Sequence, residues 1–170
     1  MLPENDPDFY KRVLLPGQEE RLKSFKLQNI DQLPTAMPPI VIHGLLRQLE
    51  IILLGGHSKS WKSWALLDLL FCVANGFPWL GFETVQGTVV RFDLELLGAE
   101  IRRRFLLIKD SYGKGSFDNL KIVSLRGKPF SPRDLDAIPI LLGDGVSLLA
   151  LEPIYRLLAG QNENDAGLGS

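Results

Sequence analysis

A short apolar run, a pair of glycines and a long apolar segment follow one another and constrain the fold most. Glu50–Leu54 is a run of Ile and Leu after one glutamate, and it ends at Gly55-Gly56. This order is typical of a buried strand that meets a tight turn. Trp61–Asn75 is apolar on almost every side and is followed by Gly76. The pattern predicts a helix that is buried by neighbours on several sides.

The rest of the chain repeats this alternation of strand and helix. We expect further strands over residues 87–95, 120–125 and 146–151. After the second strand, a helix places Leu97, Ile101, Phe105 and Ile108 on one face, with Arg102, Arg103 and Arg104 on its solvated flanks. A further helix starts at Ser131–Asp134. Strands joined through helices pair in parallel, so the predicted class is α/β, a mainly parallel sheet flanked by helices.

Proline divides the chain into two parts. Residues 1–39 contain Pro3, Pro7, Pro16, Pro34, Pro38 and Pro39. Such spacing predicts an extended arm or linker, and residues 40–170 form the folded domain.

Composition excludes several classes of protein. The 19 Lys+Arg balance 20 Asp+Glu to a net charge of -1, so no global basic field holds nucleic acid or a membrane. Acidic residues and prolines interrupt the longest apolar stretches, and neither is expected to span a bilayer. The single cysteine, Cys72, is expected to be a buried, inert thiol in a reducing, cytoplasmic location.

The loop between the first strand and helix carries the clearest functional pattern. Gly56–Ser63 follows the phosphate-binding sequence G-x-x-x-x-G-K-[ST], except that Trp61 takes the second glycine position. Backbone amides at a helix N-terminus attract an anion, Lys62 reaches the β- and γ-phosphates, and Ser63 offers an oxygen to Mg²⁺. The candidate nucleotide-binding residues are Gly56, His57, Ser58, Lys59, Ser60, Trp61, Lys62, Ser63 and Trp64.

Two interpretations of this loop stay open. Trp61 fits the phosphate-binding one if its backbone is already helical and its Cβ points away from the nucleotide. In the other, Gly55-Gly56 is only a tight turn and Lys62-Ser63 is a solvated helix start.

Acidic side chains end two of the predicted strands. Glu95 closes the second strand and Glu152 the fourth, and Asp93 precedes Glu95 on the same face. The carboxyl ends of parallel strands share one rim, where α/β sheets bind ligands. One carboxylate there would polarise an attacking water, and the other would hold hydrated Mg²⁺.

Several segments together resemble one family. From about Pro38 to Glu163 the chain is similar to the RepA-type branch of the RecA-like P-loop ATPases, AAA-type ATPases that include hexameric replicative helicases. The segments that carry the resemblance are Ile42–Glu50, Ser58–Leu69, Asn75–Phe82, Gly87–Glu95, Leu148–Arg156 and Asn162–Asp165.

The resemblance implies roles for these residues. It implies a RecA-like core that binds ATP and Mg²⁺ and hydrolyses ATP, with Glu95 as catalytic base and Glu152 in the Walker B segment. It also implies a hexamer that acts on DNA through regions absent from this chain. Three residues depart from the family pattern: Leu49 and Trp61 replace glycines, and Glu152 replaces aspartate.

The resemblance also predicts a truncated core. The family continues with another strand, a sensor residue and an arginine finger, so we expect this chain to be a fragment. Three functions then remain in view. They are an ATPase acting on nucleic acid, a non-catalytic or degenerate nucleotide-binding fragment, and a DNA-binding module without ATP chemistry.

Overall fold

The computed structural model describes Phe25 and residues 28–57, 59–128, 130, 134–135, 138, 142 and 145–158. The chain forms two compact units, residues 1–37 and 38–170. In the first unit, the described part holds one short 3-10 helix, η1 (Ile30–Gln32). All other elements belong to the second unit.

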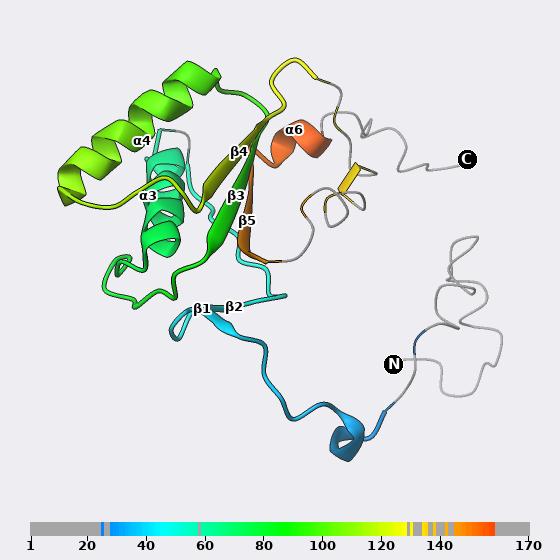
Figure 1. Ribbon diagram of the computed structural model, residues 1–170. Coiled ribbons are helices and arrows are strands. Elements are labelled where there is room, and N and C mark those ends of the chain that lie inside the picture. Colours follow the sequence, from blue (N-terminus) through cyan, green and yellow to red (C-terminus); the bar gives the residue numbers. More distant parts are fainter. Residues whose placement is uncertain are drawn as a thin grey trace, which may run out of the picture. The chain divides into compact units, whose positions relative to one another are not determined.

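A parallel sheet forms the centre of the second unit (Figure 1). Its strands are β3 (Thr88–Asp93), β4 (Leu120–Ser124) and β5 (Val146–Glu152), in the order β4-β3-β5. Both neighbours of β3 run parallel to it. The predicted α/β class is therefore confirmed, and three of the expected strands are present.

A small hairpin precedes the sheet. Its strands β1 (Ile40–Ile42) and β2 (Leu46–Arg47) are antiparallel. The Arg47 guanidinium donates to the Pro38 carbonyl at 2.8 Å, which ties the start of the unit to the hairpin.

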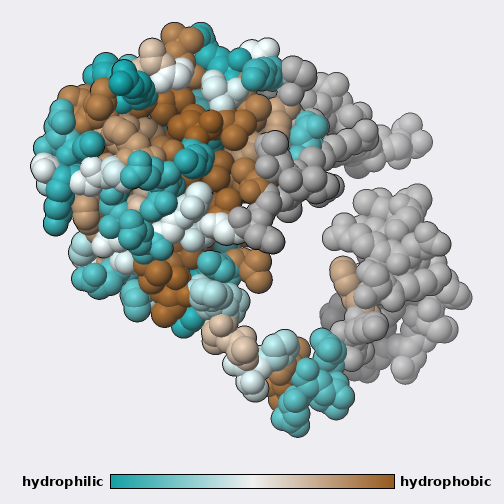
Figure 2. Space-filling model, in the orientation of Figure 1, coloured by the Kyte–Doolittle hydropathy of each residue, from teal (hydrophilic) through white to brown (hydrophobic). Residues whose placement is uncertain are grey.

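The strand predicted over Glu50–Leu54 is wrong. This segment has no strand assignment, and Ile51 and Leu53 are 97% and 76% exposed. An apolar run becomes a strand only when a neighbouring backbone pairs with it, and the described strands supply no such partner. Instead, residues 46–52 and the β5 residues Val146–Leu149 line a groove of about 390 Å³. Figure 2 shows that apolar residues, in brown, do reach the surface of this chain.

Two helices cover one face of the sheet (Figure 1). Helix α3 (Lys62–Asn75) follows the phosphate-loop sequence, and it buries every residue from 69 to 74. Gly76 caps it with a φ of 68°, a conformation that suits glycine, as predicted. A short helix, α6 (Tyr155–Leu158), follows β5.

The second covering helix is α4 (Gly98–Tyr112). It buries Ile101, Phe105 and Ile108 as predicted. Leu97 was expected on the same buried face, but it precedes the helix as N-cap and is 60% exposed. The expected helix start at Ser131–Asp134 lies largely outside the described residues.

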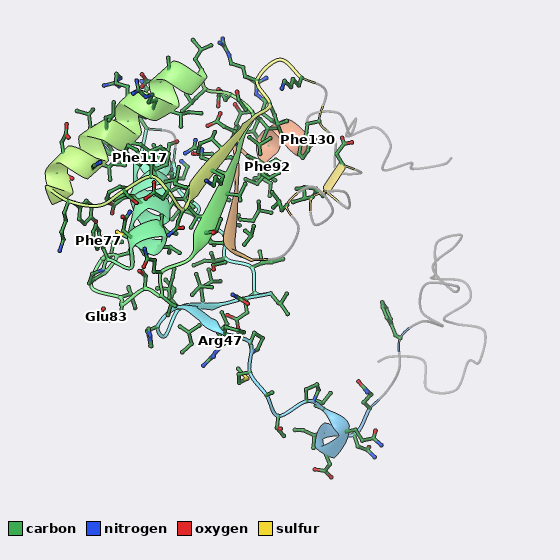
Figure 3. The ribbon with its side chains drawn as sticks, viewed as in Figure 1. Arg47, Phe77, Glu83, Phe92, Phe117 and Phe130 are labelled. Carbon is green, nitrogen blue, oxygen red and sulfur yellow. The ribbon has the colours of Figure 1, made fainter. Side chains whose placement is uncertain are left out.

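Alternate residues of β3 face opposite sides of the sheet. Val89 joins the core cluster beneath α3 and α4, whereas Val90 and Phe92 join a second cluster on the far face. Phe92 packs there against Phe130, with ring centroids 6.0 Å apart (Figure 3). Since Val89, Arg91 and Asp93 share one face, the strand also carries two charged groups beneath α3.

Cys72 lies on α3 with no exposed surface, as expected. Its sulfur is 3.0 Å from the Tyr112 hydroxyl, which donates to Asp68 at 3.0 Å. Burial is the main cause that raises the pKa of this thiol to about 11, so it stays protonated and unreactive at neutral pH. No helix in the described part of the chain is long and apolar enough to cross a membrane.

Candidate functional site

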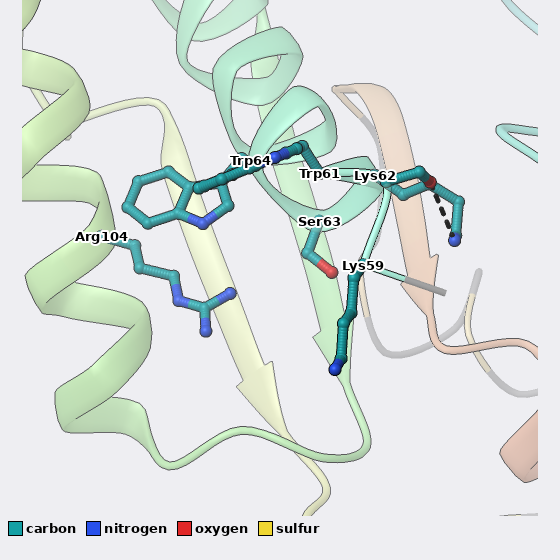
Figure 4. Close-up of a pocket in the computed structure, with 7 residues that line it drawn as sticks. Lys59, Trp61, Lys62, Ser63, Trp64 and Arg104 are labelled. Atoms are coloured by element: carbon teal, nitrogen blue, oxygen red, sulfur yellow. Dashed lines mark hydrogen bonds between the residues drawn. The ribbon is translucent and has the colours of Figure 1, made fainter. Parts of the chain in front are cut away.

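Lys62 closes the loop that precedes α3. Its ammonium group donates to the carbonyl oxygens of Gly56 at 2.7 Å and His57 at 2.5 Å, and it lies 3.3 Å from the Ser60 hydroxyl (Figure 4). All three N–H donors are therefore used within the loop. These contacts are exposed, so an anion can reach the ammonium group and compete for it.

Gly56 lies close to the side chains of Ser60 and Lys62 in this arrangement. A Cβ at this position would lie 2.9 Å from the Ser60 hydroxyl oxygen and 3.4 Å from Lys62 Cδ. The Ser60 hydroxyl in turn donates to the His57 carbonyl at 2.7 Å. Gly56, His57, Ser60 and Lys62, four of the predicted site residues, thus lie together, whereas Ser58 lies outside the described residues.

The backbone of Trp61 is not helical, so the condition under which Trp61 fitted the phosphate-binding interpretation is not met. It is the N-cap of α3 with φ 63° and ψ 15°, in the left-handed region. Leu49, which the resemblance also places at a glycine position, has a left-handed φ of 68° as well. Each such residue costs roughly 1–2 kcal/mol that glycine would not. The chain thus keeps glycine-type backbone geometry at both positions but carries large side chains there.

Ser63 and Glu152 meet at the start of α3. The Ser63 hydroxyl donates to Glu152 Oε1 at 2.5 Å, across 89 residues of sequence. This contact joins the phosphate-loop helix to the carboxyl end of β5, where both residues were expected to hold a metal ion. The Glu152 side chain is 19% exposed, so it is largely removed from water.

Arg91 is the main site residue that the sequence analysis missed. It is 1% exposed, and its Nη2 atom lies 2.5 Å from Asp93 Oδ2 and 2.8 Å from Glu152 Oε2. Glu152 Oε2 is close enough to Arg91 Nη2 for an ion pair, but the two atoms are not aligned for a hydrogen bond. The other terminal nitrogen, Arg91 Nη1, has no hydrogen-bond partner among the described residues. A charged residue inside the apolar run Val89–Phe92 was the available signal, because a buried cation requires a carboxylate partner.

Glu95 lies apart from these contacts. It follows β3 by two residues and is 47% exposed; its side-chain neighbours are the Tyr155 hydroxyl at 3.4 Å and Arg156 at 3.8 Å. Asp93 fixes the turn that carries it, because Asp93 Oδ1 accepts hydrogen bonds from the amides of Glu95 and Leu96 at 2.9 and 2.6 Å. Glu95 lines a hollow of about 540 Å³ that is separate from the one at the loop.

A hollow of about 300 Å³ lies against the loop and the first turn of α3 (Figure 4). Its walls include Lys59, Lys62 and Ser63, together with Trp64 and, from α4, Arg104. The first amides of a helix have no partners within the helix, and no acidic residue lies in the first turn of α3. The hollow therefore combines unpaired amides with positive side chains, which is what a phosphate group requires.

Comparison with known proteins identifies the family. A model described as AAA domain matches residues 16–169, nearly the whole chain. The chain belongs to the AAA domain family. This is a family of P-loop ATPases, so its members are nucleotide-binding domains. Neither a curated protein nor a solved structure matches the chain.

Gly56–Ser63 is the stretch of this AAA domain that has the phosphate-binding pattern. The hollow beside it is lined by Lys59, Lys62 and Ser63. Together with membership of the AAA domain family, these observations favour the phosphate-binding interpretation of the loop over a mere tight turn.

Proposed function

We propose that this AAA domain binds ATP at the Gly56–Ser63 loop and hydrolyses it with Mg²⁺. The observation that carries the proposal is the 2.5 Å contact between Ser63 and Glu152. It places a hydroxyl of the phosphate loop beside an acidic strand end, and these are the two oxygen donors that a nucleotide-bound Mg²⁺ uses in P-loop enzymes.

The residues present fit a magnesium ion. Mg²⁺ prefers oxygen ligands and takes only one or two from the protein, with phosphates and waters completing its shell. Ser63 Oγ and Glu152 Oε1 supply two such oxygens, and the other carboxylate oxygen, Glu152 Oε2, forms an ion pair with Arg91 at 2.8 Å. When bound, the ion would neutralise the charge that develops on the transferred phosphoryl group.

Each side chain then has one role in the proposal. Lys62 exchanges its contacts with the loop carbonyls for contacts with the β- and γ-phosphates. Glu95 accepts a proton from the attacking water as general base. The structure supports this last role by placing Glu95 on a turn that Asp93 fixes at the carboxyl end of β3.

The partners in this proposal come from the RepA-type resemblance alone. They are DNA and, in full-length relatives, a hexamer in which an arginine of a neighbouring subunit completes the site. We place the protein in the cytoplasm because its single cysteine suits a reducing compartment. With a net charge of -1, any contact of this chain with nucleic acid is local.

A second candidate is nucleotide binding without hydrolysis. The observation that favours it is Arg91, a permanent buried cation 2.8 Å from Glu152 Oε2. It neutralises the carboxylate that the reaction needs for Mg²⁺, while Lys62 and the loop amides stay available for phosphates.

Phosphate release from ATP separates the two candidates. We expect the purified chain to release phosphate from ATP in Mg²⁺ and to stop when EDTA removes the metal. Nucleotide binding without any phosphate release would instead support the non-catalytic candidate. If the chain neither binds ATP nor releases phosphate, both candidates are wrong.

A further inference from the structure

The hollow beside the phosphate loop has one wall that phosphates do not explain. On that side stand two indole rings and a guanidinium group, from Trp61, Trp64 and Arg104. Lysine, serine and backbone amides suit phosphate, whereas flat π surfaces suit another flat group. Resting on the function proposed above, we propose that Trp61, Trp64 and Arg104 form the binding surface for the purine base of the nucleotide.

Arg104 is held in place over Trp64. Its Cζ atom lies 5.3 Å from the centroid of the Trp64 ring (Figure 4). Its side chain is 20% exposed, and its Nε atom donates to Glu100 Oε1 at 2.7 Å. Arg104 was expected to be a solvated helix flank, but α4 turns it toward the start of α3. A guanidinium that already forms a cation–π contact with one ring offers a fixed edge for a second flat group.

Glu100 holds the guanidinium of Arg104 in its position near Trp64. It binds Arg103 through two hydrogen bonds of 2.8 Å and Arg104 through one. The hydrogen bonds from Arg103 and then Arg104 lower the pKa of Glu100 to about 2, so the carboxylate stays charged at neutral pH. Among the described residues, the Nη atoms of Arg104 have no hydrogen-bond partner, and they stay available for base nitrogens.

Trp61 supplies the exposed half of the surface. It is 72% exposed, and its ring centroid lies 6.4 Å from that of Trp64 at an angle of 50°. Two features of Trp61 are unfavourable for the free energy of the folded chain. Its left-handed backbone is strained, and its exposed indole leaves apolar surface in water. Both costs fall on a residue that lines the hollow, which is where a ligand could cover the ring. A purine presents a larger stacking face than a pyrimidine, so the surface favours ATP or GTP.

The test compares ATP with inorganic triphosphate, which keeps the phosphates and removes the base and sugar. Binding of each is measured by calorimetry, and the fluorescence of the indoles is recorded in the same titrations. We expect ATP to quench the fluorescence and triphosphate to leave it unchanged while still binding. Trp61→Gly and Arg104→Gln should each lower the affinity for ATP by about tenfold to a hundredfold and leave the affinity for triphosphate unchanged.

Two controls keep the outcome clear. Arg103→Gln is the matched control, because Arg103 also pairs with Glu100 but does not line the hollow, and its ATP affinity should stay that of the wild type. Trp61→Gly introduces the residue that its backbone prefers, so it should fold. If both variants lose affinity for ATP and triphosphate equally, or keep both affinities, the proposed base-binding surface is contradicted. If the wild type binds neither ligand, the proposed function itself fails.

Discussion

Replacing Arg91 by methionine should destabilise the domain by about 3–5 kcal/mol, the usual cost of leaving a buried charge without its partner. Asp93 and Arg91 are each 1% exposed, and Glu152 is largely buried beside them. Methionine fills similar space but leaves both carboxylates without a cation. Since a domain of this size has only about 5–15 kcal/mol of stability in total, Tm should fall on the order of 10 °C.

Urea unfolding of three variants checks this expectation. Arg103→Met removes an arginine that is 58% exposed and pairs on the surface of α4, so it should leave the free energy of unfolding nearly unchanged. Adding Glu152→Gln to Arg91→Met removes one of the stranded charges and should recover part of the loss. A loss below about 1 kcal/mol for Arg91→Met would show that the buried ion-pair group is not a stabilising element.

Replacing Glu95 by glutamine should lower the rate of ATP hydrolysis by about 10²–10⁴-fold, the usual contribution of a general base. Glutamine keeps the shape of the side chain but cannot take a proton from water. Among the described residues, Glu95 forms no side-chain hydrogen bond or ion pair with the loop or with Glu152, and its side-chain partners are Tyr155 and Arg156. ATP affinity should therefore change little, and the loss should fall on kcat.

The measurement is steady-state phosphate release, with ATP affinity determined in parallel. Glu83→Gln is the matched control, because Glu83 is exposed on the segment before β3 and lies in neither hollow. It should hydrolyse ATP at the wild-type rate. Undiminished turnover by Glu95→Gln would assign the general base to another residue.

The elements with a complete local pattern were the ones that the sequence predicted correctly. Helix α3 has continuous apolar residues and a glycine cap, and β3 and β5 are apolar runs of strand length that end at acidic residues. The run Glu50–Leu54 has the same composition as these strands but no strand assignment. Its conformation depends on a pairing partner elsewhere in the chain, which a local pattern does not contain.

The site shows the same division between local and distant information. Gly56, Ser60 and Lys62 were named together as site residues because the motif places them within a few residues of one another. Their contacts with one another were not predicted, because the motif assigns Lys62 to phosphates. The positions of Arg91 and Arg104 depend on which elements pack together. Arg91 meets Glu152 because β3 and β5 pair in register, and Arg104 meets Trp64 because α4 packs on α3.

The left-handed backbone at Trp61 had a different reason for being missed. The family pattern places glycine there, and glycine at a helix start often marks a positive φ. Tryptophan at that position was judged compatible with phosphate binding only if its backbone was helical. In the structure Trp61 still has the positive φ that glycine would adopt, 63°, and this conformation is strained for a tryptophan.

Calorimetric titration of Mg²⁺-ATP into the wild type and Lys62→Ala tests the central claim most directly, because Lys62 is the side chain assigned to the phosphates. Its present contacts are exposed loop carbonyls, so alanine should leave the fold intact. We expect the wild type to bind and the variant to lose about tenfold to a hundredfold in affinity, as for a charge-assisted hydrogen bond. Lys121→Ala, an exposed lysine on β4, should bind like the wild type. Equal affinity of the wild type and Lys62→Ala for Mg²⁺-ATP would contradict the assignment of this loop as the phosphate site.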